Sequence, residues 1–202
     1  MGVTQKLNWV SRSTLYRVEF YVNGLIVQYN RMVDDLKDSA QVMLDADPTK
    51  NIEASKIHSQ FSDRFALDFH FYLICWDKVN KHLGRFANNQ GENQCIKTIW
   101  DALSPLTSKA ALGRHFLEHL DKIISRKQPE EFQYFIPNYD GFAFKYFDLD
   151  RDGKRVEKQI PLGRAEVEKV MKAYEGILRC LGADISAGYP SKVNVEKSEV
   201  TR

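Results

Sequence analysis

The sequence predicts a mainly α protein, an antiparallel bundle of about five helices with a small β-hairpin element near residues 132–160. Two observations lead to this fold class. Apolar residues recur at three- and four-residue steps along two long stretches, which is the pattern of amphipathic helices. Later, an aromatic-rich segment with partial two-residue alternation is typical of strands. Residues 1–182 are expected to form a single domain, and residues 183–202, polar and without periodicity, a loose tail.

The first two elements are expected to be long helices over residues 11–45 and about 52–86, paired as an antiparallel hairpin. Ser11 or Ser13 is a candidate N-cap for the first helix, and Pro48 ends it by forcing the preceding residue out of the α region. Their expected inward positions are Leu15, Val18, Val22, Leu25, Ile26, Tyr29, Val33 and Leu36, then Ile57, Phe61, Phe65, Phe69, Tyr72, Trp76, Val79 and Leu83.

Three further helices and a hairpin complete the predicted bundle. A short helix carries Ile96 to Leu103 and is broken or kinked at Pro105, and a fourth helix spans about 107–126. The aromatic strands follow, with a turn at 150–153, and the last helix covers about 164–181. The aromatic strands have rings that suit base stacking, but packing of the hairpin on the bundle is the favoured interpretation.

Composition excludes several classes of protein. The chain has 202 residues, of which 43% are hydrophobic and 28% charged, close to an average soluble domain. A net charge of +2 creates no large field for nucleic acid or membrane. No apolar run approaches the roughly 18 residues of a membrane span, and the N-terminus lacks a signal core, so neither membrane insertion nor export is expected.

The three cysteines, Cys75, Cys95 and Cys180, are widely spaced and contain no Cys-x-x-Cys pair. Neither a disulfide framework nor a zinc ribbon is expected from this spacing, which suits a reducing cytoplasm. Cys75 lies in an apolar run and is expected to be a small core residue rather than a nucleophile. The expected location is therefore cytoplasmic.

The densest chemistry lies on the expected fourth helix, where eight residues hold one guanidinium, two imidazoles and two carboxylates: Arg114, His115, Glu118, His119 and Asp121. On a helix, His115, Glu118 and His119 share a face, as do Arg114, Glu118 and Asp121. Arg114 and His119 are about 140° apart around the axis. They cannot form one compact site on a single helix, but they can flank a groove or meet across an interface.

Two segments of the sequence fit metal-binding patterns. Asp148 to Gly153 matches the start of a calcium loop, but the twelfth position is Gln159 and the flanks are strand-like, so an acidic β-turn is favoured. His115 to His119 fits the zinc-protease pattern His-x-x-Glu-His, with a third ligand required from Glu166, Glu168 or Glu175. A His-based metallohydrolase is kept as an alternative, and a bundle metal site using His58, His70 or His82 as a weaker one.

The same cluster is also Arg114-x-x-x-x-His119, and here the chain resembles the HEPN superfamily of helical-bundle proteins, in which Arg-x(4–6)-His is usual. Two long helices before the motif and a hairpin plus a helix after it extend the resemblance over most of residues 11–181. His115 departs from the pattern, since Asn is commonest after the Arg.

The resemblance implies a metal-independent endoribonuclease or an RNA-binding relative, with two motif helices facing each other in a homodimer and no metal or cofactor. His119 would deprotonate a ribose 2′-OH, and Arg114 would bind phosphate. His115 would protonate the leaving 5′ oxygen or bind a second phosphate. Glu118 and Asp121 would support them. The alternative is a non-catalytic interaction module, such as a toxin–antitoxin or defence-type protein partner, in which these residues form surface ion pairs.

Overall fold

The computed structural model describes residues 9–45, 51–90, 93–118, 134–138, 141–149 and 152–182. It contains the helices α1 (Trp9–Asp45), α2 (Asn51–Asn89), α3 (Gln94–Glu118) and α5 (Arg164–Cys180), and the strands β1 (Tyr134–Asn138), β2 (Gly141–Leu149) and β3 (Arg155–Pro161). The predicted fold class is confirmed: the protein is mainly α with a small β element. The described residues form four helices, slightly fewer than the five expected.

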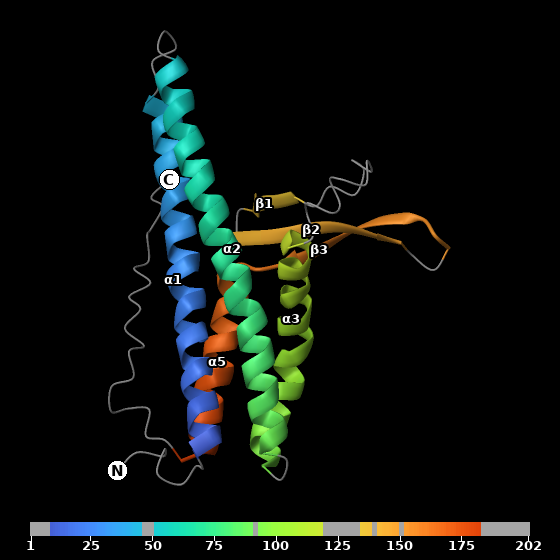
Figure 1. The fold of residues 1–202 in the computed structure, drawn as a ribbon. Coiled ribbons are helices and arrows are strands. Elements are labelled where there is room, and N and C mark those ends of the chain that lie inside the picture. Colours follow the sequence, from blue (N-terminus) through green and yellow to red (C-terminus); the bar gives the residue numbers. More distant parts are fainter. Residues whose placement is uncertain are drawn as a thin grey trace.

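The helices α1 and α2 form a long antiparallel hairpin (Figure 1). Arg31 pairs with Asp68 at 3.0 Å, and four residues further along α1 Asp35 pairs with Arg64 four residues back along α2. Gly24 crosses α2 so closely that an added Cβ would lie 2.8 Å from the Sγ atom of Cys75.

α1 begins two residues before the expected start, so the sequence-based capping assignment is wrong. Ser11 and Ser13 lie inside the helix rather than at its N-cap. The Oγ atom of Ser11 instead accepts a hydrogen bond from the side-chain amide of Gln90, at 3.1 Å, and so ties the start of α1 to the end of α2.

α3 runs without a break through Pro105, so the third and fourth expected helices are one. A proline lacks the N–H that would bond the carbonyl four residues back, here that of Asp101. The Ser104 hydroxyl donates to that carbonyl at 3.4 Å and offsets part of the loss. The helix starts after Asn93, whose side-chain oxygen accepts the backbone N–H of Ile96 as an N-cap. The expected end near residue 126 lies outside the described residues.

The three strands form an antiparallel sheet in the order β1-β2-β3, which projects sideways from the bundle (Figure 1). Pro137 is tolerated because β1 is an edge strand. Between β2 and β3, Gly153 has a φ of +72°, the left-handed conformation that a hairpin turn favours. The predicted hairpin is confirmed by the pairing of β2 with β3, and residues 150 and 151 of its turn lie outside the described residues.

α5 packs against α1 and α3, and its boundaries match the sequence-based prediction. Its first turn is capped by Glu166, whose carboxylate accepts the backbone N–H of Gly163 at 3.1 Å. Its last residue, Cys180, forms a disulfide with Cys95 at the start of α3. The sequence-based expectation of no disulfide is therefore wrong.

The core lies where α1, α2, α3 and α5 meet, and its largest fully buried side chains are Trp76, Tyr72 and Phe86 of α2. The Tyr72 hydroxyl donates to the carbonyl of Leu162 at 2.5 Å, which anchors the link between β3 and α5. The apolar positions predicted for the first two helices are confirmed wherever their side chains are described. No helix in the described part of the chain has an apolar run long enough to cross a membrane.

Candidate functional site

The structure places Arg114, the first residue of the predicted motif, against the buried side of α2. Its guanidinium pairs with the carboxylate of Asp77, and only 22% of the Arg114 side chain is exposed. The same carboxylate pairs with Lys81 at 3.0 Å. Asp77 is itself 9% exposed, so it holds a cation on either side from a nearly buried position. Arg114 is therefore a positioned side chain rather than a freely moving surface arginine.

The remaining motif residues are not brought together by the described part of the structure. His115 and Glu118 lie on α3, but their side chains are outside what is described, and His119 and Asp121 are outside it altogether. The composite site built from two copies of the motif therefore stays a prediction. The His-based metal alternatives stay untested for the same reason, although the described residues contain no group of three or more potential metal ligands.

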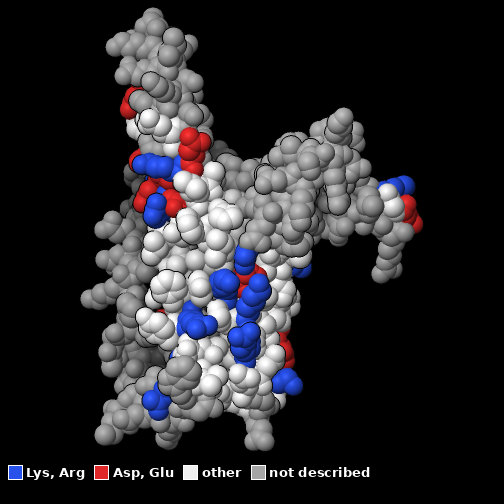
Figure 2. Space-filling model, viewed as in Figure 1, with Lys and Arg blue, Asp and Glu red and all other residues white. Residues whose placement is uncertain are grey.

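Arg114 belongs to a larger group of cations that the sequence analysis missed. Arg17 of α1 and Lys78 and Arg85 of α2 surround His82, and Lys81 and Arg114 join them through Asp77. We call these five cations, Arg17, Lys78, Lys81, Arg85 and Arg114, the basic face. Figure 2 shows Lys and Arg gathered over the lower half of α2 and the neighbouring helices, whereas higher up the molecule positive and negative side chains mix.

His82 lies among the cations of the basic face, and their positive charges affect its pKa. Burial and then the charges of Arg17, Arg85 and Lys78 lower the pKa of His82 below the ordinary value of 6.5, against an opposing effect of Asp77. The imidazole is stacked on the ring of Tyr21, with centroids 5.6 Å apart and planes within 7°. His82 is therefore neutral at pH 7 and held in place between α1 and α2.

Exposed aromatic rings border the basic face. Tyr16 and Phe20, on either side of Arg17 in the sequence, are 69% and 62% exposed. Phe20 also contacts Tyr21 edge to face, with centroids 5.2 Å apart. On α2, Phe71 is 53% exposed two turns before Lys78. Large exposed rings beside a basic surface are a feature of single-stranded nucleic-acid interfaces, because cations bind phosphates and rings stack on bases.

The arrangement concentrates positive charge in one place although the whole chain carries only +2. Within the described residues, Arg17, Lys78 and Arg85 form no ion pair with any carboxylate. Their charge is therefore available to an external anion. Lys81 and Arg114 extend the surface towards α3, where the predicted motif begins.

One signal in the sequence points to this surface. Lys78, Lys81 and Arg85 recur at three- and four-residue steps, on the side of α2 opposite the buried positions Val79 and Leu83. Arg17 lies on α1, and nothing in the sequence near Arg17 or near Lys78 indicates that the two residues come close together. The net charge of the chain does not reveal the basic face, because it sums the charges of the whole sequence regardless of where they lie on the surface.

Comparison with known proteins gives no match: no family model, no curated protein and no solved structure is significantly similar to the chain. Membership of the HEPN superfamily therefore stays a prediction that rests on the Arg114 to His119 motif and its helical context.

Proposed function

We propose that the protein binds single-stranded RNA across the outer side of the α1–α2 hairpin, and that the Arg114 to His119 segment beside this surface cleaves it without a metal ion. The observation that carries the binding proposal is the basic face with Tyr16 and Phe20 at its border. Lysine and arginine side chains that neutralise RNA phosphates release bound counterions, which favours binding. Each base stacked on an aromatic ring adds about 1–3 kcal/mol to the binding free energy. Neither contribution requires base-specific contacts.

RNA binding is tested by fluorescence polarisation with a labelled oligouridylate of about twelve nucleotides. The variant Arg17→Gln/Lys78→Gln/Arg85→Gln is expected to bind more weakly. Its salt dependence should have a slope smaller by about 2, since each lost phosphate contact removes about 0.7 from the slope for single strands. The control, Lys37→Gln/Lys172→Gln/Arg179→Gln, loses the same charge elsewhere on the chain. Equal affinity of the two variants would contradict the proposal.

The cleavage proposal assigns each motif residue a role that its chemistry allows. His119 accepts the proton of a ribose 2′-OH, His115 returns a proton to the leaving 5′ oxygen, and Arg114 stabilises charge on the phosphate. Asp77 supports this proposal because it fixes the Arg114 guanidinium from α2. Glu118 at the end of α3, and Asp121 three residues later in the sequence, are assigned to orient the histidine and arginine side chains.

Cleavage is measured on the same RNA in EDTA. The variant His119→Ala is expected to abolish it while leaving binding intact, whereas the control His70→Ala retains activity. Cleavage that persists in His119→Ala rejects the assignment, and binding without any cleavage by the wild type leaves an RNA-binding module as the function. Zinc in stoichiometric amount after purification without metal resins would favour the metallohydrolase instead.

A homodimer belongs to the cleavage proposal, because helical spacing predicts an angle of about 140° between Arg114 and His119, and a second copy would supply the missing half of the site. Light scattering under assay conditions gives the mass. An active monomer would contradict the composite site. A cytoplasmic location is proposed on the basis of RNA as substrate alone, since the Cys95–Cys180 disulfide removes the argument from reduced cysteines.

A further inference from the structure

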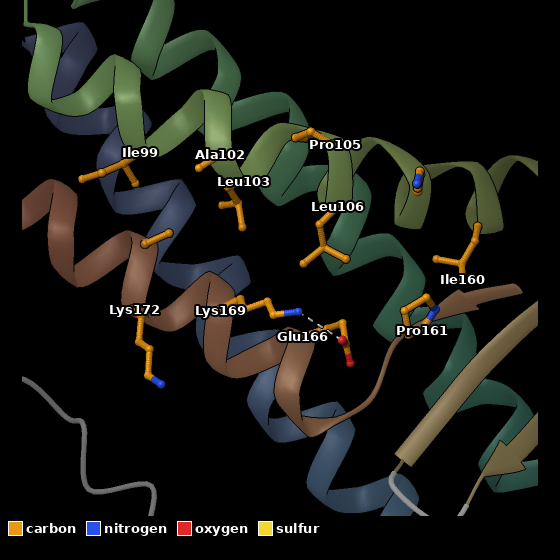
Figure 3. Close-up of a pocket in the computed structure, with 12 residues that line it drawn as sticks. Ile99, Ala102, Leu103, Pro105, Leu106, Ile160, Pro161, Glu166, Lys169 and Lys172 are labelled. Carbon is orange, nitrogen blue, oxygen red and sulfur yellow. Dashed lines mark ion pairs between the residues drawn. The ribbon is translucent and has the colours of Figure 1, made fainter.

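A cavity lies on the other side of the molecule from the α1–α2 surface, between α3, α5 and the end of β3 (Figure 3). At one end the two helices are joined by Cys95–Cys180, and one turn further Ile99 packs so tightly that an added Cβ on Gly176 would lie 3.0 Å from its Cδ1 atom. Beyond this contact the helices flank an open cavity of about 680 Å³. That volume is in the range of small-molecule sites, about 300–1,000 Å³.

The lining of the cavity combines apolar residues with lysines. Ile99, Ala102, Leu103, Leu106, Ile160 and Pro161 form the walls. Lys109, Lys169 and Lys172 line it from α3 and α5 with exposed side chains. Figure 3 shows Lys169 extending towards Glu166 and Lys172 extending away from it.

The one carboxylate of the lining is already engaged. Glu166 accepts the Gly163 N–H through Oε2, and its Oε1 atom lies 3.5 Å from the Nζ atom of Lys169. Among the described residues, Lys109 and Lys172 have no ion-pair partner. The site therefore has a surplus of positive charge next to apolar walls, which complements an anion with a hydrocarbon body.

We propose that this cavity binds a long-chain carboxylate, with its hydrocarbon chain between α3 and α5 and its carboxylate at the exposed lysines of the lining. The apolar walls account for the chain, since burying each CH₂ group is favourable by about 0.8 kcal/mol. Lys109 and Lys172 account for the choice of an anion over a neutral or cationic head, because neither has an ion-pair partner among the described residues. Their stems can also cover apolar surface while the ammonium groups stay in water. The proposal is independent of RNA binding, which uses another surface.

The test is titration of the full chain with dansyl-undecanoate, a fluorescent carboxylate, at constant ionic strength. Saturable binding with one site per chain is expected, displaced by dodecanoate but not by dodecanol or dodecyltrimethylammonium at equal concentration. Ala102→Trp fills the cavity from an exposed wall position and should abolish binding. Its control, Ala66→Trp, places the same ring on an exposed site of α2 and should have no effect.

A second variant tests whether the lysines bind the carboxylate head group. Lys109→Gln/Lys172→Gln is expected to weaken binding by about tenfold, because each exposed ion pair adds at most about fivefold. Lys78→Gln/Arg85→Gln loses the same charge from the basic face and should bind as the wild type. Absence of saturable binding, equal displacement by dodecanol, or unchanged binding by Ala102→Trp would each overturn the proposal. Circular dichroism of both tryptophan variants verifies that they fold.

Discussion

The most specific prediction about stability concerns the loss of the Cys95–Cys180 disulfide. It joins the start of α3 to the end of α5 across 85 residues of sequence. Closing a loop of that length removes entropy from the unfolded chain worth about 4.5 kcal/mol, and measured effects are typically about 2–4 kcal/mol. We expect Cys95→Ser/Cys180→Ser, or reduction of the wild type, to lower the free energy of unfolding by about 2–4 kcal/mol. For a domain of this size the melting temperature would fall by about 5–15 °C.

The assay is urea unfolding with and without dithiothreitol, combined with thiol titration in denaturant. Protein purified without reductant should show one reactive thiol, that of Cys75, and reduced protein should show three. In the native state Cys75 should react slowly, since burial raises the pKa of its thiol to about 11. The double serine variant should be insensitive to dithiothreitol, which makes it the control. Three free thiols in unreduced protein, with stability unaffected by dithiothreitol, would refute the reasoning.

Three further predictions concern α1 and α2. Asp77→Asn should lower stability by about 1–3 kcal/mol in urea unfolding, because Arg114 and Lys81 lose their shared carboxylate, whereas Asp38→Asn on an exposed position should change little. Gly24→Ala should cost about 1–3 kcal/mol by overpacking against Cys75, and adding Cys75→Ala should restore part of the loss; a stable single variant would contradict the close crossing. Stability should fall as pH decreases through 6.5, because the lowered pKa of His82 lets the unfolded chain take up its proton first. His82→Gln should show a shallower fall in unfolding titrations between pH 8 and 5, and an identical fall would reject this role.

The long helices were predictable because their burial repeats with the period of a helix. Leu15, Val18 and Val22 are buried at three- and four-residue steps, and Phe69, Tyr72 and Trp76 do the same on α2. The hairpin turn was predictable because Gly153 supplies the left-handed residue that the turn favours. Such signals are local, so a single sequence carries them.

The two errors about the helices and the disulfide have different causes. Pro105 was expected to break the helix, but the neighbouring Ser104 donates to the carbonyl that lacks the proline N–H and offsets part of the loss. The disulfide joins residues 85 positions apart, which no local spacing reveals.

The candidate functional residues also include some that are contiguous in the sequence and some that come together only in the fold. The Arg114 to His119 motif is contiguous and could be found in the sequence. The basic face needs Arg17 from one helix and Arg85 from another, and the cavity needs α3 and α5 together, so neither is visible before the chain is folded.

The central claim, that RNA lies across the outer side of the α1–α2 hairpin, is tested most directly by photocrosslinking. An oligouridylate containing 4-thiouridine is irradiated with the protein, and the crosslinked peptides are identified by mass spectrometry. We predict crosslinks on α1 around Tyr16 to Tyr21 and on α2 between Phe71 and Arg85, lost in Arg17→Gln/Lys78→Gln/Arg85→Gln. Crosslinks confined to the strands β2 and β3 or to α5, with these two segments unmodified, would contradict the account.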